Sequence, residues 1–209
     1  MKYRSLVFDF DGTIADTLDE GLKIYNHLAG QHGLKKVDDH EIHILRNMKL
    51  NDFLDHLGVS RMLVPKLLYR GTQMLKSRIE RLPLIEGIKD VLPFLRQNAE
   101  NFGILTSNSV DNVKLFLQHH QLENTFDIIS STSKLTGKAK HLQSIRRRFS
   151  TQPEEMIYIG DEIRDIKAAK KAGVPIAAVS WGFNSADALL DAGPDYLMNH
   201  PAELTNLVH

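Results

Sequence analysis

The sequence predicts an α/β fold with a mostly parallel sheet and an all-helical insertion. From residue 83 onward, short apolar runs alternate with segments of helical periodicity, a pattern typical of parallel strands joined by helices. From Thr17 to Leu82 the periodicity is helical and no convincing strand occurs. That stretch is too long for a loop and does not continue the alternation, so we interpret it as an inserted helical unit.

The first strand is expected at Ser5–Phe8, where three consecutive apolar residues follow the serine, as in strands buried on both faces. A helix then begins at Leu18 and ends at the glycines 30 and 33. Further helices of the insertion are expected near 40–46, 51–57 and 62–79. Later strands are expected at 102–106, 126–129, 156–159, 175–179 and 196–197, and later helices at 87–97, 110–120, 138–148, 163–171, 185–192 and 201–208. We therefore predict a Rossmann-like core of residues 1–16 and 83–209, with a helical cap of residues 17–82.

Composition excludes several classes of protein. The chain has 209 residues, 42% of them hydrophobic and 25% charged, as in ordinary globular proteins. Lysine plus arginine equals aspartate plus glutamate at 26 each, so no overall charge favours nucleic acid or a membrane surface as partner. The absence of cysteine removes disulfides, thiolate zinc sites and cysteine nucleophiles. No apolar run approaches the ~18 residues of a membrane span, and the N-terminal apolar stretch is cut at Asp9, so we expect no secretory signal and a cytoplasmic location.

Two acidic residues follow the first strand, at Asp9 and Asp11, before Gly12-Thr13. Carboxyl ends of strands are where open α/β sheets bind ligands. Two buried carboxylates repel one another unless a cation lies between them, and a hard cation such as Mg²⁺ suits oxygen ligands. An Asp-Gly pair after an apolar run also occurs in hairpin turns, so this segment alone leaves both interpretations open.

Three further strand ends or helix starts carry polar groups. Ser107-Asn108 follows the second strand, Lys138 begins a helix after Gly137, and Asp161 and Asp165 follow the strand at 156–159. The spacing of four puts the two aspartates on one side of the first helical turn. Each segment taken singly is also typical of an ordinary helix cap or solvated turn. All of them in order, each at an expected strand end or helix start, indicate one site.

The four segments resemble the sequence motifs of the haloacid dehalogenase-like hydrolases. Asp9-Phe10-Asp11-Gly12-Thr13 is similar to the first motif of that superfamily, Ser107-Asn108 to the second, Lys138 to the third, and Gly160-Asp161 with Asp165 to the fourth. The resemblance covers essentially the whole chain. The helical insertion and the run 158–184 are most similar to the phosphoglycolate phosphatase-like branch. An acid at Asp11 favours phosphate esters over haloacids, because departure of a halide needs no proton.

The resemblance implies a role for each matched residue. Asp9 would be the nucleophile that forms an aspartyl-phosphate, and Asp11 the general acid and base. Mg²⁺ would be held by Asp9, the Asp11 backbone carbonyl and Asp161, with Asp165 acting directly or through water. Ser107, Asn108 and Lys138 would surround the phosphoryl oxygens. Lys140 is the alternative to Lys138.

Substrate choice is expected in the cap, since the core motifs contact only the phosphoryl group. The segment 45–49 resembles the substrate-contacting cap loop of the family, so Arg46 and Lys49 are candidate substrate-binding residues. The alternative is that both are ordinary surface cations.

The expected function is a Mg²⁺-dependent phosphatase acting on a small phosphorylated metabolite, such as a phosphoglycolate-like compound. A phosphosugar mutase shares both aspartates and is the enzymatic alternative. A non-catalytic metabolite-binding protein is the alternative from another class, although no chemical residue of the motifs is missing. The expected partners are the metabolite alone, with neither nucleic acid nor membrane, and the chain as monomer or homodimer.

Overall fold

The computed structural model describes residues 2–132 and 137–208. The core range predicted above also includes residues 1, 133–136 and 209, which lie outside this description. The strands are β1 (Ser5–Phe8), β2 (Asn101–Thr106), β3 (Ile128–Ser131), β4 (Met156–Gly160), β5 (Ile176–Val179) and β6 (Tyr196–Met198). They form one sheet in the order β3-β2-β1-β4-β5-β6, and every neighbouring pair is parallel. The predicted α/β fold with a mostly parallel sheet is confirmed.

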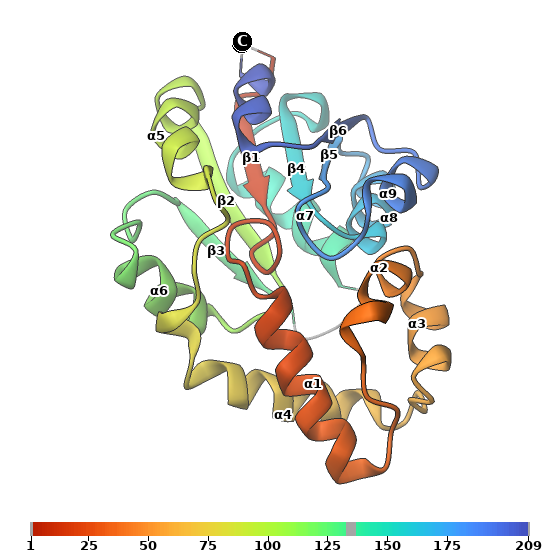
Figure 1. The fold of residues 1–209 in the computed structure, drawn as a ribbon. Coiled ribbons are helices and arrows are strands. Elements are labelled where there is room, and N and C mark those ends of the chain that lie inside the picture. The colour runs from red at the N-terminus through yellow and green to blue at the C-terminus, as the bar shows by residue number, and fades with distance from the viewer. Residues whose placement is uncertain (1, 133–136, 209) are drawn as a thin grey trace.

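Helices cover both faces of this sheet (Figure 1). They are α5 (Ile88–Asn98), α6 (Val110–His119), α7 (Lys138–Arg148), α8 (Ile163–Ala172) and α9 (Ala186–Asp191), with 3₁₀ helices η3 (Pro153–Glu155) and η4 (Pro201–Leu207). Successive strand residues point to opposite faces. Leu6 and Phe8 therefore pack in one apolar cluster with α5, α6 and η4, whereas Val7 packs in the other with α7, α8 and α9.

The segment between β1 and α5 is helical throughout its named elements. These are α1 (Leu18–His32), η1 (Asp39–Glu41), α2 (Ile42–Leu45), α3 (Leu50–His56), α4 (Val64–Lys76) and η2 (Ile79–Arg81). It has an apolar cluster of its own, made by Val37, Leu45, Leu54, Leu57 and Val59. In Figure 1 these helices lie beyond the carboxyl ends of the strands, at the opposite end of the molecule from the C-terminus. The division into a core of 1–16 and 83–209 and a cap of 17–82 stays our prediction.

The two segments that connect the core to the helical insertion lie side by side. Ala15 and Leu84 form an antiparallel bridge, the Asp16 amide donates to the Pro83 carbonyl at 2.9 Å, and the Ile85 amide donates to the Ile14 carbonyl at 2.9 Å. Entry to and exit from the helical segment are thus joined by backbone hydrogen bonds.

Two predicted elements were wrong in detail. The third strand was expected at 126–129 and lies at Ile128–Ser131, because Phe126 packs against Phe8 and Phe102 from the loop before it. The last element was expected as a helix over 201–208 and is a 3₁₀ helix, Pro201–Leu207.

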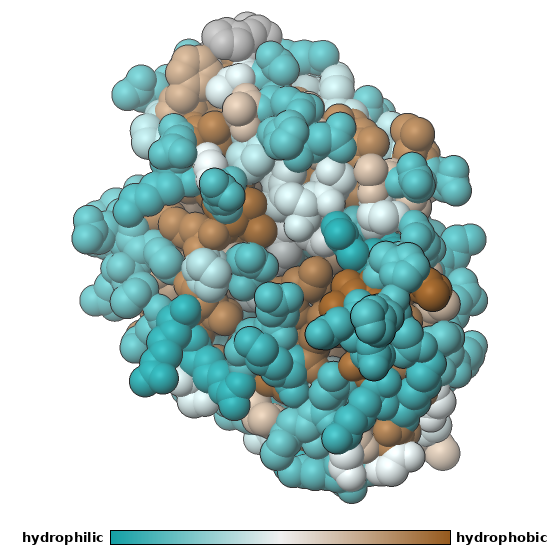
Figure 2. Space-filling view, viewed as in Figure 1, coloured by the Kyte–Doolittle hydropathy of each residue, from teal (hydrophilic) through white to brown (hydrophobic). Residues whose placement is uncertain are grey.

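Hydrophobic groups on the face shown in Figure 2 lie in small areas among hydrophilic side chains. Within the described ranges, we find no helix with the length and apolar character that crossing a membrane requires.

Candidate active site

The strand order reverses between β1 and β4, and the candidate site lies there. From β1 the chain continues to one side through β2 and β3, and later to the other through β4, β5 and β6. Open α/β sheets bind ligands at such a reversal, beyond the carboxyl ends of the strands. Asp9 directly follows β1, and Asp161 directly follows β4. The first and fourth sequence motifs therefore meet at this position.

Lys138 joins the first motif to the helix of the fourth. It is the first residue of α7, is 3% exposed, and its Nζ donates to Asp9 Oδ2 at 2.5 Å and to Asp165 Oδ1 at 2.7 Å. Burial alone lowers the pKa of a lysine, but Asp165 and Asp9 raise the pKa of Lys138 on balance, so it is charged. Lys140, the alternative from the sequence, is exposed. The structure brings Lys138, and not Lys140, to the carboxylates.

The pKa values of the two carboxyl groups that share Lys138, those of Asp9 and Asp165, shift in opposite directions. Burial raises the pKa of Asp9 well above its ordinary value, and the nearby Lys138 only opposes that rise. Burial also acts on Asp165, but the positive charges of Lys138 and Arg164 lower its pKa on balance. The negative charge of Asp165 is therefore compensated by the cations beside it, whereas the negative charge of Asp9 is compensated only in part.

Asp11 is held by the second motif. The Nδ2 group of Asn108 donates to both carboxylate oxygens of Asp11, at 3.2 and 3.3 Å. Asn108 is 4% exposed and is itself fixed, because its Oδ1 accepts from Asn112 Nδ2 at 2.9 Å. Burial raises the pKa of Asp11, and the hydrogen bond from Asn108 partly offsets this rise. A carboxyl group with a raised pKa is suited to general acid catalysis near neutral pH.

Asp161 is enclosed by backbone on two sides. Its oxygens accept from Thr13 Oγ1 at 2.9 Å and from the Phe183 amide at 2.7 Å. A Cβ atom at Gly12 or at Gly182 would lie 2.3 Å from Asp161, and Gly12 also has φ +75°, so both close approaches require glycine. Burial, with Glu162 and Asp165 nearby, raises the pKa of Asp161 to about 7.

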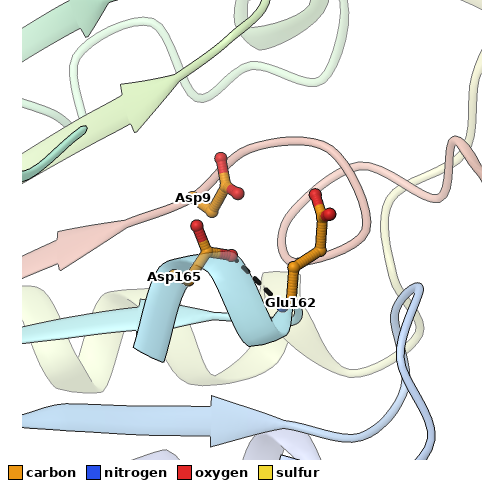
Figure 3. Close-up of side chains that lie close together, drawn as sticks. All are labelled: Asp9, Glu162 and Asp165. Atoms are coloured by element: carbon orange, nitrogen blue, oxygen red, sulfur yellow. Dashed lines mark hydrogen bonds between the residues drawn. The ribbon is translucent and has the colours of Figure 1, made fainter. Parts of the chain in front are cut away.

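Carboxyl groups outnumber the cations beside them in the candidate site. The carboxyl groups are those of Asp9, Asp11, Asp161, Glu162 and Asp165, and the cations beside them are Lys138 and Arg164. Oxygen atoms of Asp9, Glu162 and Asp165 all lie within 4.8 Å of one another (Figure 3). Buried carboxylates in excess, with raised pKa values at Asp9 and Asp161, form the donor set that a hard divalent cation takes. The residues present therefore fit Mg²⁺.

Sequence reasoning missed two residues of this site. Glu162 belongs to the oxygen cluster, and its carboxylate is paired with the guanidinium of Arg164. Burial lowers the pKa of an arginine, but Glu162, Asp165 and Asp9 raise the pKa of Arg164 on balance. Both residues lie inside the fourth motif, between the matched Asp161 and Asp165. Their place in the motif could have identified them as site residues from the sequence.

The remaining candidates lie at the edge of the site or outside it. Ser107 is half-buried directly after β2, and Lys49 is exposed. Arg46 caps α2, and its guanidinium donates to backbone carbonyls of residues 180, 182 and 183 in the core. A substrate contact for Arg46 or Lys49 stays a prediction.

The sequence matches a known protein family over most of its length. A family model described as haloacid dehalogenase-like hydrolase matches residues 6–179. The chain belongs to this family. The resemblance inferred from the motifs is thereby confirmed, and the protein is an enzyme of the hydrolase class.

This haloacid dehalogenase-like hydrolase has named relatives along nearly its full length. A phosphoglycolate phosphatase from Synechococcus elongatus is 33% identical over 205 residues, which are 98% of this chain and 97% of the relative. A pyrophosphatase, PpaX from Bacillus mycoides, is 22% identical over 98% of this chain and 96% of its own. Among solved structures, a haloacid dehalogenase-like family hydrolase from Streptococcus pneumoniae has a TM-score of 0.83 at 22% identity, covering 100% of this chain and 99% of that one.

Proposed function

We propose that the protein is a Mg²⁺-dependent phosphatase that hydrolyses a small phosphorylated metabolite of the phosphoglycolate type. The observation that carries the proposal is the grouping of Asp9, Asp11 and Lys138 where the strand order reverses. A nucleophile, a proton donor and a fixed cation are what transfer of a phosphoryl group to a side chain needs.

In the first step, a carboxylate oxygen of Asp9 attacks phosphorus and the bond from phosphorus to the ester oxygen breaks. Asp11 gives its proton to the departing oxygen, and its raised pKa keeps that proton available. Lys138 holds Asp9 in place and offsets the negative charge of the transferring group. The products of this step are the alcohol and an aspartyl-phosphate on Asp9.

In the second step, Asp11, now ionised, takes a proton from water. The water oxygen attacks phosphorus, the bond to Asp9 breaks, and inorganic phosphate is released. Asp11 thereby recovers the proton that it gave in the first step, and Asp9 recovers its carboxylate.

Asp9, the Asp11 carbonyl, Asp161 and Asp165 would hold Mg²⁺, as the family resemblance implies. Asp9 and Asp165 belong to the oxygen cluster described above, whose third member is Glu162 and not Asp161. The two oxygens of Asp161 each accept one hydrogen bond already, but a carboxylate oxygen has a further lone pair for a cation. When bound, the ion supplies positive charge to the phosphoryl oxygens and to the surrounding carboxylates. Ser107 would bind a phosphoryl oxygen, and Lys49 is the cap residue proposed to contact the rest of the substrate. The Arg46 guanidinium already donates to three core carbonyls, so a substrate contact of Arg46 is the alternative to a structural role. We propose the metabolite as the only partner, with the chain as monomer or homodimer.

The proposed substrate class is supported by the relative that is 33% identical, a phosphoglycolate phosphatase. Two alternatives share the same chemistry. Pyrophosphate is one, because a more distant relative is a pyrophosphatase. A phosphosugar mutase is the other, because it too uses two aspartates, but it returns the phosphoryl group to a sugar phosphate.

The test is a screen of phosphorylated metabolites with Mg²⁺, including phosphoglycolate, pyrophosphate and β-glucose 1-phosphate. Release of inorganic phosphate is measured for the wild type and for Asp9→Asn. We expect phosphoglycolate to have the largest specificity constant and Asp9→Asn to lose the activity. Preference for pyrophosphate, or a sugar product formed through a bisphosphate without release of phosphate, would assign one of the alternatives.

A further inference from the structure

The turn between α2 and α3 is docked on a loop of the core. We call residues 180–185, which follow β5, the bridge segment. Arg46 Nη2 donates to the Ser180 and Gly182 carbonyls, both at 2.9 Å, and its Nε donates to the Phe183 carbonyl at 3.2 Å. One planar guanidinium thus spans three carbonyls of the bridge segment, a geometry that a lysine cannot reproduce.

Asn184 links this turn to the fourth motif. Its Nδ2 donates to the Arg46 carbonyl at 2.9 Å and to the Met48 carbonyl at 3.2 Å. Its Oδ1 accepts from the Ile163 amide at 2.9 Å, at the start of the helix that carries Asp165. Asn184 is 3% exposed, so these bonds form away from water, where leaving them unmade is costly.

The other side of the bridge segment encloses Asp161. The Phe183 amide donates to Asp161 Oδ2 at 2.7 Å, and the Asn184 amide donates to the Asp161 carbonyl at 3.2 Å. The ring of Phe183 also packs edge-on against Phe53 of α3, with centroids 5.7 Å apart. A displacement of the α2–α3 turn would therefore release the segment that fixes Asp161.

We propose that Arg46 is a positioning residue that couples docking of the helical segment to the geometry of Asp161 and Asp165, and thereby to binding of Mg²⁺. Arg46 acts through the bridge segment and not by touching the reacting atoms. The proposal rests on the metal site of the proposed function. Coupling between two sites is reciprocal, so bound Mg²⁺ strengthens docking by the factor by which docking strengthens Mg²⁺ binding.

The variants for the test are Arg46→Ala, Arg46→Lys and Phe53→Leu. The matched control is Lys66→Ala, which removes an exposed positive charge from α4 of the same helical segment. Calorimetry with Mg²⁺ alone gives the dissociation constant for each protein. Amide hydrogen exchange of residues 180–185, with and without Mg²⁺, reports docking, because the Ser185 amide donates to the Arg46 carbonyl at 3.0 Å.

We expect Arg46→Ala to raise the Mg²⁺ dissociation constant about fivefold or more, the lower end of the usual range for coupled sites. Arg46→Lys should also raise the constant, since an ammonium group lacks the separate Nε donor that binds the Phe183 carbonyl. Phe53→Leu should raise the Mg²⁺ dissociation constant by a smaller factor. This variant tests the coupling even if the arginine variants do not fold. Mg²⁺ should slow exchange of the bridge segment in the wild type and in Lys66→Ala, but much less in Arg46→Ala.

Activity separates this role from a direct substrate contact. A positioning role predicts equal losses of the specificity constant for phosphoglycolate and for a generic aryl phosphate, whereas a contact predicts the larger loss for phosphoglycolate. A folded Arg46→Ala protein with the wild-type Mg²⁺ dissociation constant and unchanged exchange would overturn the coupling alone. A wild type that does not bind Mg²⁺ would instead overturn the metal site and the coupling together.

Discussion

Lys138 provides the sharpest test of the site, because a matched control lies two residues away on the same helix. Lys138→Ala removes a buried ammonium group that binds two carboxylates, at 2.5 and 2.7 Å. Lys140→Ala removes the same charge from an exposed position of α7. The two variants have the same composition, so they differ only in where the charge was lost.

Lys138→Ala is expected to lower both the free energy of unfolding and kcat. Removing one partner of a buried ion pair leaves an uncompensated charge and costs about 3–5 kcal/mol of unfolding free energy. Removing a cation from the phosphoryl site costs transition-state stabilisation of about 2.7–4 kcal/mol, or roughly 10²- to 10³-fold in kcat. An exposed lysine such as Lys140 contributes within about ±0.5 kcal/mol.

Urea denaturation at pH 8 without Mg²⁺ measures the first effect, and steady-state kinetics at saturating Mg²⁺ measures the second. At pH 8 Asp165 is ionised, because its pKa is lowered, so the loss of its partner is fully expressed. If Lys140→Ala proves the more damaging change in kcat, the assignment of the third motif to Lys138 is wrong.

Three further outcomes are expected. Asp9→Asn should lower kcat by ~10³-fold or more, in the range for loss of a reacting group, and near-normal turnover in a clean preparation would refute its role as nucleophile. Because the pKa of Asp161 is about 7, protons compete with Mg²⁺ below that pH; calorimetry should show affinity falling as the pH drops from 8 to 6, and a flat profile would contradict this. Asn108→Ala removes a hydrogen bond that lowers the pKa of Asp11, so the alkaline limb of the kcat profile should move to higher pH, and a shift to lower pH would count against Asp11 as the acid.

Strand positions followed from the sequence where the strand is buried on both faces. Ser5–Phe8 is completely buried and apolar after its first residue, and its predicted bounds match those of β1. β3 is an edge strand that ends in Ser130 and Ser131 and is half-buried, so its polar end carries no apolar signal. The apolar Phe126 before it packs in the core from a loop, which moved the predicted strand two residues too early.

The site was predictable as far as local sequence order determines it. The residues that follow β1, β2 and β4 meet because parallel strands end at one edge. Partners that are distant in sequence and bind backbone leave no pattern, so the contacts of Arg46 with residues 180–183 could not be inferred. Glu162 lay within the matched motif, yet only coordinates show that its oxygen lies near Asp9.

The connecting segments joined at Ala15 and Leu84 bear on how the chain folds. Strand β1 pairs with β2 in a register that matches Ser5 with Asn101, so closing this pair directly would bring together residues almost half the chain apart. Loop-closure entropy and contact order make such distant pairings slow. Because helices form from local contacts, we expect the insertion to collapse first and, with its two ends adjacent, to shorten the remaining search between β1 and β2. The compact insertion thus shortens the effective loop between β1 and β2. We expect a substitution that breaks the contact between its two ends to slow formation of the sheet, even where it leaves the native site unaltered.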